Sequence, residues 1–124
     1  MNIDFGKRLE AILEKDKRYK IDAYEFIMQA LSFAQKKLKK KGHLSAKELL
    51  TGVKDLAFEQ FGPMARTVLR HWGVNSTDDF GEIVFNMIEN GLLFKTEEDS
   101  RDDFKAVYDF AEVFDSKKYK FDLN

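Results

Sequence analysis

The sequence has no cysteine, a single proline (Pro63) and only seven glycines among its 124 residues. The absence of cysteine excludes disulfide bonds, thiolate metal sites and cysteine nucleophiles. A chain of this length can bury one sufficient core, so it needs neither a disulfide nor a metal for stability. Proline and glycine are the residues that most often interrupt helices, and their scarcity therefore leaves long windows open to helix formation.

A targeting segment and a long apolar run are lacking as well. The first residues show no basic region followed by an apolar stretch, which a secretion signal requires. The longest charge-free stretch near the centre covers the ten residues 26–35, whereas crossing a bilayer takes about 20. We therefore expect a cytoplasmic protein without membrane contact. The formal net charge of −1 argues against a protein that coats nucleic acid by bulk charge.

Apolar residues make up 44% of the sequence, and five windows of it carry them at helical spacing. We predict a mainly α-helical fold in one compact domain over residues 1–115, followed by a polar C-terminal tail over residues 116–124. The five predicted helices cover residues 3–14, 22–41, 45–61, 64–72 and 76–90.

Local signals mark where several of these helices begin and end. Asp22 is a candidate N-cap for the second helix, and Gly42 can take the left-handed conformation that terminates it. Ser45 and Glu48 have the spacing of a capping box, in which each side chain bonds the other residue's backbone. Pro63 is suited to the first position of the fourth helix, because its missing N–H would have no partner there.

The segment after the fifth helix is ambiguous. Residues 92–96 are predicted to be extended, and Phe104, Ala106, Tyr108 and Phe110 alternate as a strand does. The same residues also fit a helix. We favour a β-hairpin between residues 92–96 and 104–110, because an extended segment needs a backbone partner. A helix followed by a hairpin is typical of winged-helix domains.

The residues that carry chemistry do not form a catalytic or metal-binding motif. His43 and His71 belong to no paired histidine motif, and no serine lies in a nucleophile elbow. There is no glycine-rich phosphate loop and no calcium loop. The acidic cluster of Asp78, Asp79 and Glu82 could hold a hard cation, but helix capping and a solvated face explain it better. We therefore predict no catalytic residues, no metal and no cofactor.

Charges are segregated along the chain. Residues 36–54 contain seven lysines and one acid, whereas residues 97–115 contain eight acids against Arg101 and Lys105. A lysine patch can attract phosphates or an acidic protein surface, although lysines at a helix end also complement the helix dipole. The candidate binding residues on this ground are Lys36, Lys37, Lys39, Lys40 and Lys41.

Residues 56–74 resemble a helix-turn-helix motif. Arg66 and Arg70 are four residues apart, so they share one helical face and could contact phosphates or guanine edges. Three features count against DNA reading. The spacing from the first helix to the turn is one residue too long, Pro63 sits in the turn, and Leu69 stands where a base-reading residue belongs.

Four phrases of the sequence resemble a family of small bacterial proteins called Verruco-Plancto-restricted. They are DKRYKIDAYEFIMQAL, FGPMARTVLRHWGV, TDDFGEIVFNMIENGLL and KTEEDSRDDFKAVYDF, and the similarity covers about residues 16–114. The family has no established activity, so the resemblance implies relatives and no function. Within these phrases, polar residues that a core does not explain are Arg66, Thr67, His71, Asp79, Lys95, Thr96 and Asp99.

Three functional hypotheses follow. The first is a non-catalytic interaction module that binds a macromolecule, with a protein partner favoured, because oppositely charged regions can steer and orient a partner. The second is a nucleic-acid-binding protein that uses residues 36–41 with Arg66 and Arg70. The third is a small enzyme or ligand-binding protein in which Arg66, His71 and Asp79 meet near a buried Trp72. The sequence leaves the oligomeric state open.

Overall fold

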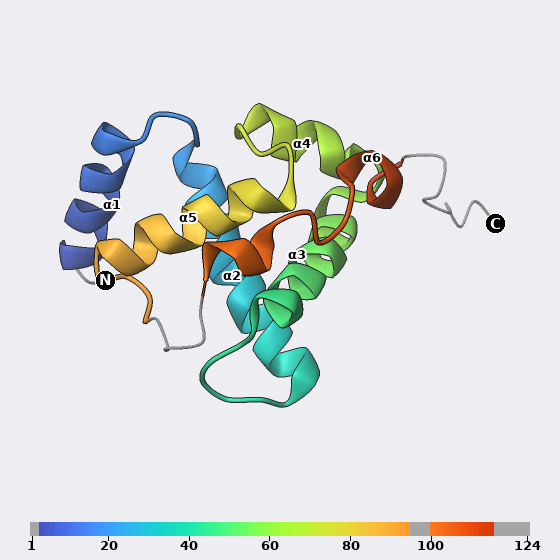
Figure 1. Ribbon diagram of the computed structural model, residues 1–124, viewed down its shortest axis with the longest axis horizontal. Coiled ribbons are helices and arrows are strands. Elements are labelled where there is room, and N and C mark those ends of the chain that lie inside the picture. Colours follow the sequence, from blue (N-terminus) through green and yellow to red (C-terminus); the bar gives the residue numbers. More distant parts are fainter. Residues whose placement is uncertain (1–2, 95–99, 116–124) are drawn as a thin grey trace.

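The computed structural model describes residues 3–94 and 100–115 (Figure 1). All five predicted helices are present, and each end lies within one residue of the expected position except that of the second helix, which ends three residues earlier. The elements are α1 (Ile3–Lys15), α2 (Ile21–Leu38), α3 (Ala46–Phe61), the 3-10 turn η1 (Gly62–Met64), α4 (Ala65–His71), α5 (Thr77–Glu89), the 3-10 turn η2 (Arg101–Phe104) and the single-turn α6 (Phe110–Val113).

Helix α2 is the central element of the bundle. It packs against both α3 and α5, while α1 packs on α5 and α4 packs on α3 (Figure 1). Their apolar positions recur at three- and four-residue steps, which places one stripe of each helix against its neighbours. The shared core contains residues that are 0% exposed: Ala23, Ile27, Ala30, Leu50, Val53, Ala57, Leu69, Phe80, Ile83 and Met87.

Gly52 allows α2 and α3 to approach closely. A Cβ atom at this position would lie 2.7 Å from the Cβ of Ala34 and 3.4 Å from the carbonyl oxygen of Ala30. The contact thus joins a glycine of α3 to two alanines of α2, and small residues at all three positions keep the helices together.

The helix ends confirm one predicted cap and correct two others. Ser45 caps α3 as a full capping box, with Glu48 N–H donating to Ser45 Oγ at 3.1 Å and Ser45 N–H to Glu48 Oε1 at 2.9 Å. Asp22 is not the N-cap of α2, because the N-cap is Lys20, two residues earlier, and the helix begins at Ile21. Gly42 lies beyond the helix end, and Lys39 takes the left-handed terminating conformation instead, with φ 53° and ψ 38°.

The junction between α3 and α4 is a tight 3-10 turn that contains Pro63, so Pro63 precedes α4, which begins at Ala65, and is not its first residue. Leu69 is fully buried, so it faces the core and cannot read bases. Trp72 is half-buried rather than buried, and its ring lies 5.5 Å from that of Phe26 and 5.6 Å from that of Phe61.

The predicted C-terminal hairpin is wrong for residues 104–110, and no strand occurs within residues 3–94 and 100–115. Two local caps explain the difference. Ser100 Oγ accepts from Asp102 N–H at 3.2 Å and starts η2, and Asp109 Oδ1 accepts from Ala111 N–H at 2.9 Å and starts α6. The structure therefore does not support a winged-helix fold. Residues 95 and 96 of the predicted first strand, and the predicted tail over residues 116–124, lie outside the described residues.

The aromatic residues that suggested a strand serve as core contacts of the closing segment. Phe104 packs against Phe85 of α5 with ring centroids 6.5 Å apart, and Phe110 packs against Phe80 at 6.0 Å. Phe114 lies 5.3 Å from Phe58 of α3. Residues 100–115 therefore cover α5 and α3 without pairing with another extended segment.

Candidate functional site

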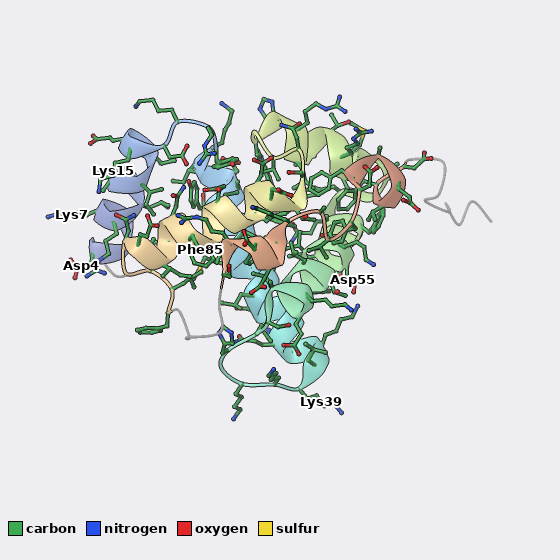
Figure 2. All side chains as sticks on the ribbon, in the orientation of Figure 1. Asp4, Lys7, Lys15, Lys39, Asp55 and Phe85 are labelled. Atoms are coloured by element: carbon green, nitrogen blue, oxygen red, sulfur yellow. The ribbon has the colours of Figure 1, made fainter. Side chains whose placement is uncertain are left out.

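The densest group of exposed cations lies where α2 ends and α3 begins. We call it the lysine end; its members, all exposed, are Lys36, Lys37, Lys39, Lys40, Lys41 and Lys47. Lys39 marks this end of the molecule at the bottom of Figure 2. The last turn of α2 and the capped first turn of α3 bring these lysines together, because the two helices run side by side and the loop between them is short.

Two of these lysines are already paired. Lys37 Nζ lies 3.2 Å from Asp55, and Lys40 Nζ lies 3.0 Å from Glu48. The pKa of Glu48 lies below its usual value, first because of the hydrogen bond from Ser45 N–H and then because of the one from Lys40. No ion pair with a described residue is formed by the other four members of the lysine end, which are Lys36, Lys39, Lys41 and Lys47. The lysine end therefore keeps a net positive charge.

An apolar groove of about 420 Å³ lies beside the lysine end. Its walls come from α2, α3, α5, η2 and the loops that precede α3 and follow α5. Phe94, at its edge, is 95% exposed, which is unusual for a large apolar side chain. The lining residues are Leu31, Gln35, Gly42, His43, Leu44, Ser45, Ala46, Leu49, Val84, Phe85, Ile88, Leu92, Leu93, Phe94, Asp103 and Phe104.

A second depression, which we call the basic hollow, adjoins the groove and has a volume of about 410 Å³. The two share His43, Ser45, Ala46 and Asp103, so an occupant of one reaches the other. The remaining lining residues of the basic hollow are Lys40, Lys47 and Glu48. An apolar surface thus continues into a surface that carries two lysines of the lysine end.

Arg66, Arg70 and His71 lie at the other end of the molecule. All three are exposed on α4. The residue after His71, Trp72, accepts a hydrogen bond from Lys20 N–H at 3.1 Å, which places the end of α4 beside the start of α2. The lysine end lies beyond the far end of this 18-residue helix, and at 1.5 Å per residue the separation is about 27 Å. The fold therefore does not bring Arg66 and Arg70 together with residues 36–41.

Asp79 is engaged in bonds that hold the fold together. Its carboxylate accepts from the Tyr19 hydroxyl at 2.6 Å and from Asn75 N–H at 2.8 Å. Burial raises the pKa of Tyr19, and the hydrogen bond to Asp79 raises it further, so Tyr19 stays protonated as a donor. Both oxygens of Asp79 are thus occupied, and the structure shows no contact between Asp79 and the exposed Arg66 or His71.

A polar network, which the sequence does not predict, joins the segment after α1 to α2 and α5. Asp16 accepts from Arg18 Nε at 2.9 Å and Nη2 at 2.7 Å. It also accepts from the side-chain amide of Asn86 at 2.9 Å, and that amide donates to the Tyr24 hydroxyl at 3.1 Å. Asp16 and Asn86 are 70 residues apart, so no local spacing could reveal their contact.

Arg101 extends the charged surface around this network to the closing segment. Its guanidinium lies 2.7 Å from Glu89 and 3.6 Å from Glu82, and it stacks over the Phe85 ring at 5.0 Å. Arg18 also lies 3.6 Å from Glu82. Each arginine is thus neutralised by carboxylates of the same protein, and the arrangement fastens η2 and the 16–18 segment to α5.

The described part of the chain offers no site for a metal ion of three or more histidine or carboxylate ligands. Nor does any of its helices have the length and apolar content to cross a membrane. Lys95, Thr96 and Asp99 of the predicted candidates lie outside the described residues. Comparison with family models, curated proteins and solved structures finds no match to this chain.

Proposed function

We propose that this protein is a non-catalytic interaction module that recognises a protein partner through the lysine end. The observation that carries the proposal is the gathering of four lysines without described ion-pair partners beside an apolar groove. Exposed cations steer an acidic partner toward the surface and orient it, and apolar area supplies affinity once it is covered.

Three arguments favour protein over nucleic acid as the partner. The lysine end is interrupted by the carboxylates of Glu48 and Asp55, which would lie close to phosphates. The exposed Arg66 and Arg70 are about a helix length away, so they do not form one continuous basic surface with the lysine end. The chain as a whole carries a net charge of −1, which gives no general attraction to a polyanion.

The test is affinity capture from lysate of the cells that make the protein, with and without nuclease. The binding variant carries Lys39→Glu, Lys41→Glu and Lys47→Glu. The matched control carries the same change in charge at Lys7, Lys15 and Lys17, which are exposed and lie on or just after α1; Figure 2 labels the first two at the opposite side of the molecule from Asp55. We expect a nuclease-resistant protein partner that the control retains and the binding variant loses.

Two results would overturn the proposal. A partner that both variants retain would bind elsewhere on the molecule. A partner that disappears after nuclease treatment would favour the nucleic-acid alternative. Titration of binding to duplex DNA and RNA against salt then measures that alternative, because each phosphate contact steepens the loss of affinity with rising salt.

A further inference from the structure

We infer that the apolar groove and the basic hollow together bind one short segment of a partner protein, in which a bulky apolar side chain is flanked by carboxylates. The inference rests on the proposed function and specifies the chemistry of its partner. The apolar side chain enters the groove, and the carboxylates contact lysines of the lysine end. The recognition mode is an apolar anchor with a charged flank.

The groove has the shape and composition that an apolar anchor needs. Leu31 of α2 and Ile88 of α5 are half-buried on its walls, and the largely buried Phe85 and Phe104 lie deeper. Its volume of about 420 Å³ is within the range of pockets that enclose organic ligands, about 300 to 1,000 Å³. Phe94 is 95% exposed at the edge, and a bound segment would cover that ring.

The acidic flank is favoured by the excess cations of the lysine end rather than by the hollow itself, where two lysines face two carboxylates. Both carboxylates already accept hydrogen bonds within the protein: Glu48 from Ser45 N–H and from Lys40, and Asp103 from Ser100 N–H at 3.2 Å. Lys47 has no ion-pair partner among the described residues and remains available to an incoming carboxylate. Lys41, exposed in the adjoining loop, offers a second cation.

A peptide explains the two features together better than a nucleic-acid strand does. A strand of nucleic acid could pair with the lysines and stack a base on the exposed Phe94, but its phosphates would then lie close to the carboxylates of Glu48 and Asp103 in the hollow. A peptide of mixed apolar and acidic residues satisfies both parts within a few residues. We therefore assign the site to a protein segment.

The experiment selects ligands from a displayed library of random peptides on the full chain. We expect the enriched sequences to combine Leu, Phe or Trp with neighbouring Asp or Glu. A labelled enriched peptide is then titrated by fluorescence polarisation against four forms: wild type, Phe94→Asp in the groove, Lys41→Glu with Lys47→Glu at the hollow, and Lys17→Glu as a control. Phe94→Asp changes an almost fully exposed side chain, so this variant tests the groove without disturbing the core.

We expect the groove variant and the lysine variant each to bind at least about tenfold more weakly than wild type, and the control to bind as wild type does. Replacement of the peptide's apolar anchor by alanine should weaken binding to a similar degree. If the lysine variant loses binding but Phe94→Asp and the alanine peptide do not, the groove inference is wrong while the proposed function stands. If neither variant loses binding, or if no peptide is enriched, the inference is wrong, and so is the proposal that the lysine end binds the partner.

Discussion

Thr77 shows how much one side chain contributes to the attachment of the closing segment. Its hydroxyl is fully buried, donates to the Phe104 carbonyl at 2.6 Å and accepts from Val107 N–H at 3.1 Å. A valine at this position has nearly the same shape but leaves both backbone groups without that partner. We expect Thr77→Val to lower the free energy of unfolding by about 1 to 3 kcal/mol.

Urea unfolding at neutral pH measures this loss, and Thr77→Ser is the matched control. Serine keeps the hydroxyl and removes one methyl group, so it should cost only about 1 kcal/mol. Equal losses for the two variants would show that the methyl contacts, not the hydrogen bonds, hold the segment in place.

Asp16 makes the stability of the folded protein depend on pH in a predictable direction. The hydrogen bond from the Arg18 side chain is the largest cause that holds the pKa of Asp16 well below its usual value, and Asn86 adds to it against an opposing effect of burial. A carboxylate with a lowered pKa in the folded state stabilises the protein above its unfolded pKa of about 4. That stabilisation is lost as the pH falls toward the folded pKa.

The test compares the free energy of unfolding of wild type and Asp16→Asn between neutral pH and the acid range below about pH 4. We expect the variant to be less stable at neutral pH, and the gap to narrow progressively below about pH 4, because only the wild type has this stabilisation to lose. The free energy of unfolding from urea titrations at several pH values checks the trend. Parallel curves for the two proteins would contradict this role of Asp16.

At the scale of elements, Gly81 sets how closely η2 approaches α5. A Cβ atom at Gly81 would lie 2.7 Å from the Cβ of Phe104 and 3.0 Å from its Cγ. The ring is buried, so the neighbour cannot simply swing away. We expect Gly81→Ala to lower the free energy of unfolding by about 1 to 3 kcal/mol through overpacking.

Gly6 in α1 provides the matched control, because a Cβ atom there would meet nothing within 4 Å. The same substitution at Gly6 should raise the free energy of unfolding by about 0.5 to 1 kcal/mol, since alanine favours the helix and restricts the unfolded chain. Thermal melts followed by circular dichroism measure both. Stabilisation by both substitutions would show that η2 can move away from α5 at little cost.

Element boundaries were predictable wherever the signal is local. The capping box of Ser45 and Glu48 depends on two side chains that are three residues apart. Asp22 and Gly42 carry the right residue types, but Asp22 lies two residues after the N-cap Lys20 and Gly42 lies three residues after the C-cap Lys39. The alternating apolar pattern of residues 104–110 wrongly predicted a strand. The caps at Ser100 and Asp109 satisfy backbone groups that a strand would otherwise pair.

At the scale of the molecule, residues 100–115 complete the core. Phe104, Phe110 and Phe114 are each 5% exposed or less, and Tyr108 donates to the Leu50 carbonyl at 2.8 Å. Burial of one large apolar side chain contributes about 1.5 to 3 kcal/mol, and the whole stability of a domain is about 5 to 15 kcal/mol.

We therefore expect a chain that ends before Ser100 to lose cooperative unfolding. Circular dichroism should show residual helix without a sharp thermal transition. In NMR spectra, the chemical shifts of the amide protons should fall within a narrow range. A truncated chain that still melts cooperatively near the wild-type temperature would show that the five longer helices form a sufficient core by themselves.

The sequence alone determined the helical class, the five main helices and the presence of a lysine cluster, because helix periodicity, capping and charge runs depend on neighbours along the chain. The tertiary structure alone decided which of these residues meet. It placed Arg66 and Arg70 a helix length from the lysine end, occupied Asp79 with Tyr19 and Asn75, and built the groove from segments as distant as Leu31 and Phe104. Such contacts depend on how whole helices pack, and packing is a property of the assembled core that no short window of sequence contains.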